Sequence, residues 1–246
     1  MAAGEATKRV CLLTGAGGRL GSTFCADFAR DYDIVAVCRT RLPEAPSQFE
    51  EFVDPLDPDL ALPENGGRVH IVRADLEQPG QVERVVDIAL ARFGRIDLLV
   101  NNAAYSRWHR PGLVEAEPAL IDLDRHFSVN VGLPARLSAR IASEFWRHRV
   151  DENLAANRNI VNISSLAASR VFPGQGQAVY AASKAALNQL TRHLGSEFAA
   201  FGVRANALAP NSFPDIVETA RVAESIVRLD RDTVTGRVLV VDAESV

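Results

Sequence analysis

The chain has 246 residues, of which 47% are hydrophobic and 24% are charged, the balance of an ordinary globular protein. The formal net charge is −4 and the arginines are scattered, so charge gives no reason to expect nucleic acid or an anionic membrane as a partner. Cys11, Cys25 and Cys38 lie in apolar surroundings without metal-ligand spacing, which indicates reduced core thiols, a reducing compartment and no metal site.

The N-terminal segment is polar and lacks the apolar core of a signal peptide. No apolar run approaches the roughly 18 residues that a membrane span requires. We therefore expect a cytoplasmic protein.

Short β-branched runs alternate with helical patterns from end to end. Strands are expected at 10–14, 34–38, 69–73, 96–101, 159–164, 204–208 and 238–241, and helices at 22–30, 81–93, 117–150, 180–201 and 216–229. Near-continuous apolar strands separated by amphipathic helices indicate a parallel sheet covered on both faces. With right-handed crossovers, this pattern predicts a single α/β domain with a doubly wound, Rossmann-like sheet.

One segment, 41–67, breaks this alternation. It contains five of the twelve prolines and seven acidic residues, so it cannot sustain a regular helix. We interpret it as an acidic, proline-rich loop.

A glycine-rich turn, TGAGGRLG, occupies 14–21 between the first expected strand and the helix after it. Glycines in this setting permit a tight turn and close backbone approach to a pyrophosphate at the helix N-terminus. The spacing of Gly15, Gly18 and Gly21 is G-x-x-G-x-x-G rather than G-x-G-x-x-G, so the signal alone is weak. An ordinary glycine turn is the alternative.

The end of the second expected strand bears on the choice of cofactor. An NAD site usually has Asp or Glu there, to accept hydrogen bonds from the ribose hydroxyls. Here Cys38 is followed by Arg39, Thr40 and Arg41, and two guanidinium groups could pair with a 2′-phosphate, with Arg19 as a third. This predicts NADP(H) over NAD(H); for Arg39 the alternative is a solvated surface arginine.

Tyr180 and Lys184 stand at i and i+4 at the start of a helical stretch, so they share one face. A free phenol, with a pKa of about 10, is a poor proton carrier at neutral pH. A neighbouring ammonium favours the phenolate and makes acid–base work feasible. A Tyr-x-x-x-Lys spacing is common by chance, so motifs elsewhere in the chain must decide whether this pair is catalytic.

The ordered motifs resemble those of the short-chain dehydrogenase/reductase family over almost the whole chain. They are TGAGGRLG at 14–21, ADL at 74–76, NNAA at 101–104, the asparagine of FSVNVG, IVNISS at 160–165, YAASKAAL at 180–187, VRANALAP at 203–210 and TGRVLVVD at 235–242. The resemblance implies hydride transfer between a nicotinamide cofactor and a small-molecule substrate, in a homodimer or homotetramer built through the helices expected at 117–150 and 180–201.

The resemblance also implies catalytic roles. Tyr180 is then the proton donor in reduction, and Lys184 binds the nicotinamide ribose and lowers the tyrosine pKa. Ser165 hydrogen-bonds the substrate oxygen, with Ser164 as the neighbouring alternative. Asn130 kinks its helix and holds a water that continues the proton path to Lys184.

Cofactor contacts carried by the same resemblance run along the whole chain. Asp75 is expected at the adenine, Asn102 and Ala103 on the adenosine side, and the residues after Pro210 at the carboxamide. The full predicted set is Gly15, Gly18, Arg19, Leu20, Gly21, Arg39, Thr40, Asp75, Leu76, Asn102, Ala103, Ala104, Tyr180, Lys184, Pro210, Asn211 and Ser212.

Three departures limit the resemblance. Arg19 stands where the common turn has glycine, giving TGx3RxG, which is similar to pteridine reductases; those enzymes often carry Asp where this chain has Ser165. Asn211 replaces the usual glycine, although asparagine tolerates unusual backbone angles. The segment 211–222 is a short substrate lid, which implies an open site, a large substrate, or a cover supplied by a neighbouring subunit or by the 105–112 loop.

Three functions therefore stay open. The leading hypothesis is reduction of a carbonyl, or oxidation of an alcohol, in a small or medium organic substrate. Reduction of a C=N bond in a pterin or cyclic imine is the second, suggested by Arg19. A catalytically inactive cofactor-binding regulatory protein is the third, suggested by Asn211 and the short lid.

Overall fold

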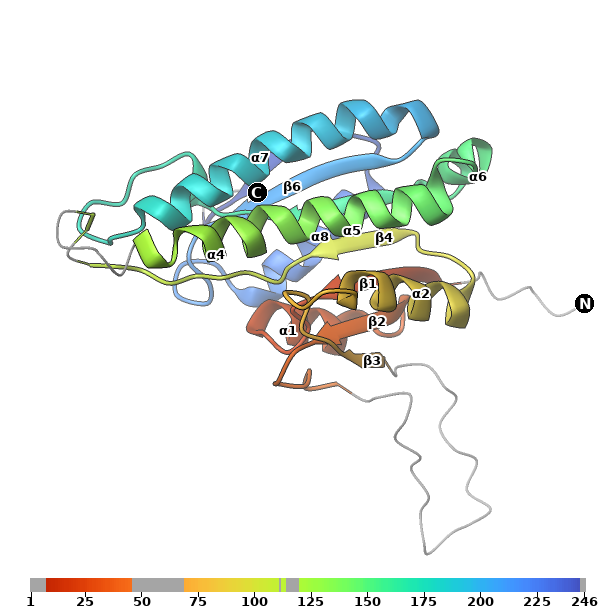
Figure 1. Cartoon of the computed structure of the whole chain (residues 1–246), viewed down its shortest axis with the longest axis horizontal. Coiled ribbons are helices and arrows are strands. Elements are labelled where there is room, and N and C mark those ends of the chain that lie inside the picture. Colours follow the sequence, from red (N-terminus) through yellow and green to blue (C-terminus); the bar gives the residue numbers. More distant parts are fainter. Residues whose placement is uncertain (1–7, 46–68, 111, 114–119, 244–246) are drawn as a thin grey trace, which may run out of the picture.

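The computed structural model describes residues 8–45, 69–110, 112–113 and 120–243. Its centre is a seven-stranded parallel sheet in the order β3-β2-β1-β4-β5-β6-β7, with helices on both faces (Figure 1). The strands are β1 (Arg9–Thr14), β2 (Tyr32–Cys38), β3 (His70–Arg73), β4 (Leu98–Asn101), β5 (Asn159–Ile163), β6 (Arg204–Pro210) and β7 (Val238–Val241). The predicted doubly wound α/β sheet is confirmed.

Two hydrophobic cores lie on opposite faces of the sheet, because successive strand residues point to opposite sides. In β1, Leu12 packs in the core beneath α2 (Gln81–Phe93), α5 (Leu133–Ile141) and α7 (Ala178–Glu197). Its neighbours Cys11 and Leu13 pack in the other core, beneath α1 (Arg19–Phe28) and α8 (Thr219–Arg231).

The helix expected at 117–150 is interrupted. Its described part comprises α4 (Leu123–Phe127), a π-helical turn at Ser128–Gly132, α5, a second π-helical turn at Ala142–Trp146 and then α6 (Val150–Ala155). Period counting along the sequence cannot detect a π-turn, because one added residue barely changes the hydrophobic spacing. The acidic loop expected at 41–67 lies outside the described residues from position 46 onward.

The thiols are part of the cores. Cys11, Cys25 and Cys38 are buried and free, and burial raises the pKa of Cys25 to about 12. Within the described ranges, no cluster of three or more His, Cys, Asp or Glu side chains could hold a metal ion. No helix in the described part of the chain is both long and apolar enough to cross a membrane.

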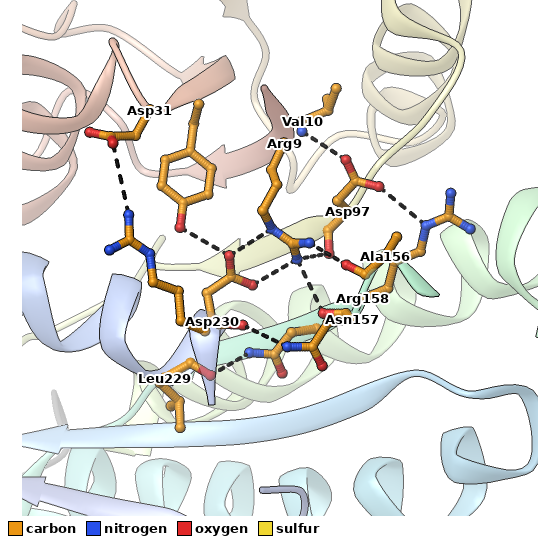
Figure 2. A network of polar contacts seen from close by, with 12 residues as sticks. Arg9, Val10, Asp31, Asp97, Ala156, Asn157, Arg158, Leu229 and Asp230 are labelled. Carbon is orange, nitrogen blue, oxygen red and sulfur yellow. Dashed lines mark hydrogen bonds and ion pairs between the residues drawn. The ribbon is translucent and has the colours of Figure 1, made fainter. Parts of the chain in front are cut away.

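A buried network of charged side chains joins α8 to the beginnings of the strands (Figure 2). The Asp230 carboxylate, at the end of α8, accepts hydrogen bonds from Arg9 Nε at 2.9 Å, Arg9 Nη2 at 3.0 Å and the Tyr32 hydroxyl at 2.9 Å. Its side chain is fully buried, whereas that of Arg9 is 26% exposed. Burial raises the pKa of Asp230, and the Arg9 guanidinium opposes that rise.

The same network reaches the middle strands. Arg9 also donates to the carbonyls of Asp97 and Ala156. The buried Asp97 carboxylate accepts from the Val10 amide at 3.0 Å and from Arg158 Nε at 3.3 Å. Backbone groups at this edge of the sheet are therefore paired with side chains rather than left unsatisfied.

We expect Arg9→Met to destabilise the protein by about 3–5 kcal/mol, because it leaves a buried carboxylate without its principal partner. The free energy of unfolding in urea measures the effect. Arg231→Met is the matched control, since Arg231 pairs with Asp31 at 3.8 Å on the surface and should contribute less than about 1 kcal/mol. Equal losses in the two variants would contradict the assignment.

Candidate active site

A cavity of about 470 Å³ opens at the carboxyl ends of the strands, around the point where β1 lies between β2 and β4. Ligands of open α/β sheets bind at this reversal of strand order. Eleven predicted cofactor residues line it: Gly15, Gly18, Arg19, Leu20, Arg39, Thr40, Asp75, Leu76, Asn102, Ala103 and Ala104. The cavity lining does not include the predicted catalytic residues, nor Gly21, Pro210, Asn211 and Ser212. It does include Tyr105, Ser106 and Phe213.

The glycine turn has the geometry of a pyrophosphate cradle. Gly15 has a φ of +64°, a conformation that favours glycine. A Cβ at Gly21 would lie 2.5 Å from the Gly15 carbonyl oxygen, so only glycine allows this approach. Helix α1 begins directly after Gly18, and its first amide groups are available to an anion. These residues fit the phosphates of a dinucleotide.

Asn102 holds this turn from the neighbouring strand. Its Nδ2 donates to the carbonyls of Thr14 and Gly15, both at 3.0 Å. The Thr14 hydroxyl in turn accepts from the amides of Asn102 and Ala103 at 3.0 Å. The side chain of Asn102 is thus committed to the backbone of β1.

Carboxylates stand beside the arginines that were expected to bind a 2′-phosphate. Arg39, Arg41 and Arg19 all line the cavity. Arg39 Nη1 lies 3.2 Å from Glu77 Oε2, and Arg41 Nη2 lies 2.9 Å from Glu44 Oε1. Arg19 forms no ion pair with any residue that the structure describes. No carboxylate was expected near the end of β2. Glu77, in the segment after β3, places one beside Arg39.

Tyr180, Ser165 and Lys184 come together beside the end of β5. Ser165 lies beside the Tyr180 side chain, and its hydroxyl accepts from the Ala167 amide at 3.2 Å. Lys184 is 2% exposed, and its Nζ donates to the Ile163 carbonyl at 2.7 Å and lies 5.9 Å from the centroid of the Tyr180 ring. The Ser164 hydroxyl instead donates to the Lys184 carbonyl at 3.3 Å, so Ser165 is the serine that contacts Tyr180.

Burial dominates the protonation of this group. It raises the pKa of Tyr180, and the hydrogen bond from Ser165 only opposes that rise. It also lowers the pKa of Lys184 to about 8. The causes of the Tyr180 shift do not include the charge of Lys184, so the lowering of the tyrosine pKa by the lysine stays a prediction.

Asn130 lies in the π-helical turn and its side chain holds the backbone that follows β4. Its Oδ1 accepts from the Tyr105 amide at 2.8 Å, and its Nδ2 donates to the Tyr105 carbonyl and to Ser183 Oγ, both at 2.9 Å. The helix is irregular where a kink was expected. The predicted water-holding role stays a prediction.

The loop after β4 is anchored beside the cavity, which Tyr105 and Ser106 line. The Asp122 carboxylate accepts from the Tyr105 hydroxyl at 2.9 Å and lies 3.0 Å from His109 Nε2. The His109 amide donates to the Gly176 carbonyl at 3.0 Å, which joins this loop to the segment before Tyr180. Helix α8 begins at Thr219, so the segment between β6 and this helix is 211–218, and Asn211 does not adopt a positive φ.

Sequence reasoning missed several site residues. His126 is fully buried between the rings of Tyr105, at a centroid distance of 4.8 Å, and Tyr180, at 6.1 Å. Neither of its ring nitrogens forms a hydrogen bond with a described residue, and burial lowers its pKa, so the imidazole is neutral at pH 7. Its position one helical turn before Asn130 was the available signal. Glu77, Arg125 and Phe213 were missed because only tertiary contacts bring them to the cavity.

Comparison with known proteins identifies the family. A model of the family described as short chain dehydrogenase matches residues 9–225. The chain belongs to the short-chain dehydrogenase/reductase family. As a member, it is an NAD(P)-dependent oxidoreductase that acts on small substrates.

Its relatives in this family act on varied substrates. The chain is 28% identical over 211 residues to glucose 1-dehydrogenase 2 of Bacillus subtilis, covering 85% of this chain and 73% of the relative. It is 28% identical over 231 residues to 3-oxoacyl-[acyl-carrier-protein] reductase of Thermotoga maritima, covering 94% and 82%. A 3-ketoacyl-(acyl-carrier-protein) reductase from Brucella melitensis, solved with NADH, superposes with a TM-score of 0.76 at 25% identity, covering 96% of this chain and 97% of that one.

We expect Lys184 to titrate near pH 8, because its ammonium group is desolvated. The chain has only two lysines, Lys8 and Lys184, so the two side-chain 13Cε signals can be followed by NMR and assigned with Lys8→Met. The signal that remains in Lys8→Met should titrate near pH 8. A midpoint for that signal near the ordinary lysine value of about 10.4 would contradict the desolvation argument.

The same shift has a consequence for stability. Between pH 8 and 10.5 the unfolded state binds more protons than the folded state, so stability rises with pH in this window. Relative to Lys184→Met, the wild-type free energy of unfolding should increase by roughly 2–3 kcal/mol across it. Parallel pH profiles for the two proteins would show that the lysine is not perturbed.

Proposed function

We propose that this protein is an NADP(H)-dependent reductase of a carbonyl group in a small or medium organic substrate, or the corresponding alcohol dehydrogenase. The supporting observation is the contact between Tyr180 and Ser165, one helical turn from the buried ammonium group of Lys184. A hydroxyl pair beside a buried cation suits proton transfer to an oxygen that gains negative charge.

Each residue then has a distinct task. When bound, the cofactor would supply the hydride that the substrate carbon accepts in reduction, and would accept it back in oxidation. Tyr180 delivers the proton to the substrate oxygen in reduction and withdraws it in oxidation. Ser165 donates its hydroxyl hydrogen bond to the same oxygen, which stabilises the charge that develops there. Lys184 provides a fixed positive charge next to them, and the loop joined to Gly176 excludes water.

The cavity supports the proposed cofactor. The glycine turn and the beginning of α1 would hold the pyrophosphate, and Asp75 and Leu76 would hold the adenine. Arg19, Arg39 and Arg41 line the same cavity and would meet the 2′-phosphate of NADP(H).

We also propose association into a homodimer or homotetramer. Apolar side chains on and around α4 are exposed in the single chain: Leu120 by 62%, Ile121 by 75%, and Leu123 and Phe127 each by 38%. They belong to the helical stretch through which the family resemblance expects subunits to meet, and a second copy would remove them from water.

Tyr180→Phe should reduce turnover by about 10²–10⁴-fold, the usual contribution of a positioned general acid. NADPH affinity, measured by quenching or transfer of protein fluorescence, should change little because the ring remains. Tyr32→Phe is the matched control, since it removes a phenol hydroxyl at the opposite edge of the sheet. Full turnover in Tyr180→Phe would refute the mechanism.

The bond that is reduced can be identified with a substrate panel. We expect NADPH oxidation with ketones or aldehydes rather than with dihydropterins or cyclic imines. The second candidate, C=N reduction, is favoured by Arg19, which lines the cavity, and activity confined to the pterin or imine substrates would establish it instead. Cofactor binding without turnover on any member of the panel would point to the inactive regulatory protein.

A further inference from the structure

Glu77 occupies the cationic end of the cavity, between two guanidinium groups. Its Oε2 lies 3.2 Å from Arg39 Nη1 and 2.8 Å from Arg125 Nη2, and its Oε1 accepts from Arg125 Nε at 3.0 Å. All three side chains line the cavity that the cofactor is proposed to fill. The carboxylate is therefore within contact distance of the arginine to which the 2′-phosphate was assigned.

Of these side chains, Glu77 is held by more hydrogen bonds and is less exposed than Arg39. The Glu77 side chain is 26% exposed, and its amide donates to Asp75 Oδ1 at 3.1 Å. Arg125 donates two hydrogen bonds to the Glu77 carboxylate, and its Cζ lies over the Tyr105 ring, 4.5 Å from the ring centroid. Arg39 has a 53% exposed side chain and a single hydrogen bond to Glu77.

The arrangement acts against a phosphate more than against a hydroxyl. A 2′-phosphate carries close to two negative charges at neutral pH, and to bind Arg39 it would have to replace the Glu77 carboxylate as the partner of that guanidinium group. A ribose 2′-hydroxyl has no such conflict, because a carboxylate accepts its hydrogen bond.

We propose that Glu77 determines cofactor selectivity: by competing for Arg39, it weakens NADP(H) binding and brings the affinity for NAD(H) close to that for NADP(H). The inference rests on the proposed use of this cavity for a nicotinamide dinucleotide. It assigns to a residue after β3 the role of the acidic residue that is missing at the end of β2.

Direct binding tests this without a known substrate. Dissociation constants for NADPH and NADH are measured by fluorescence or calorimetry for wild type, Glu77→Gln and Arg39→Ala. Glu77→Gln should tighten NADPH by about five- to tenfold, the effect of freeing one charged contact, and should leave NADH equal or weaker. Arg39→Ala should weaken NADPH by a similar factor and NADH by less than about twofold.

Two controls make the result specific. Asp87→Asn removes an acidic charge from an exposed pair with Arg140, outside the cavity, and should change neither constant. In the Arg39→Ala background, Glu77→Gln should alter NADPH binding by less than about twofold, since Glu77 acts through Arg39.

The possible outcomes separate the two proposals. If wild type binds neither cofactor, the proposed function fails and the selectivity inference fails with it. If wild type binds NADPH but Glu77→Gln leaves the ratio of the two constants unchanged, the inference is overturned while the proposed function stands. A lower NADPH dissociation constant in Glu77→Gln, together with no such change in the Arg39→Ala background, supports both the proposed function and the selectivity inference.

Discussion

The pairing of Asp230 with Arg9 is the interaction on which the sheet and its site depend. In a parallel sheet all strands begin at one edge, where their first backbone groups need partners. Arg9 begins β1, Tyr32 begins β2, and Asp97 and Arg158 precede β4 and β5 directly. Charged side chains from these positions converge on two buried carboxylates and fix the strand beginnings relative to each other (Figure 2). Because the strands are short, a fixed beginning also fixes the opposite ends.

At the opposite ends of the strands, two asparagine side chains hold backbone segments beside the cavity. Asn102 bonds the carbonyls of Thr14 and Gly15, and Asn130 bonds both backbone groups of Tyr105. The Asn102 amide donates both of its bonds, whereas the Asn130 amide both donates and accepts. The glycine turn is therefore held by the residue that follows β4, and the loop after β4 is held by the π-helical turn in addition to its own contacts with Asp122 and Gly176.

Charge is distributed unevenly around the cavity. The group of Tyr180, Ser165 and Lys184 contains one cation, the buried Lys184, whose pKa is lowered to about 8. The far end is exposed and contains alternating arginines and glutamates, with Glu77 shared by Arg39 and Arg125. Desolvation governs the first region, and competition between partners governs the second. Chemistry and cofactor choice can thus vary independently in this fold.

Much of the fold could be read from the sequence. Alternating apolar strands and amphipathic helices predicted the sheet, because burial on both faces dictates those periodicities, and β7 and α2 have the predicted bounds. The order of motifs located the glycine turn, Ser165, Tyr180 and Lys184, since local spacing places a tyrosine and a lysine on one helical face.

Contacts between distant segments could not be read in this way. Glu77 and Arg39 are separated by 38 positions, and no local sequence pattern predicts that they pair. The same holds for His126 against Tyr180 and for the burial that raises the tyrosine pKa. The sequence by itself determined the alternation of strands and helices, the glycine turn and the shared helical face of Tyr180 and Lys184, because periodicity and motif order are local properties. Only the tertiary structure decided their electrostatic surroundings, because desolvation and charge pairing depend on what the fold brings next to them.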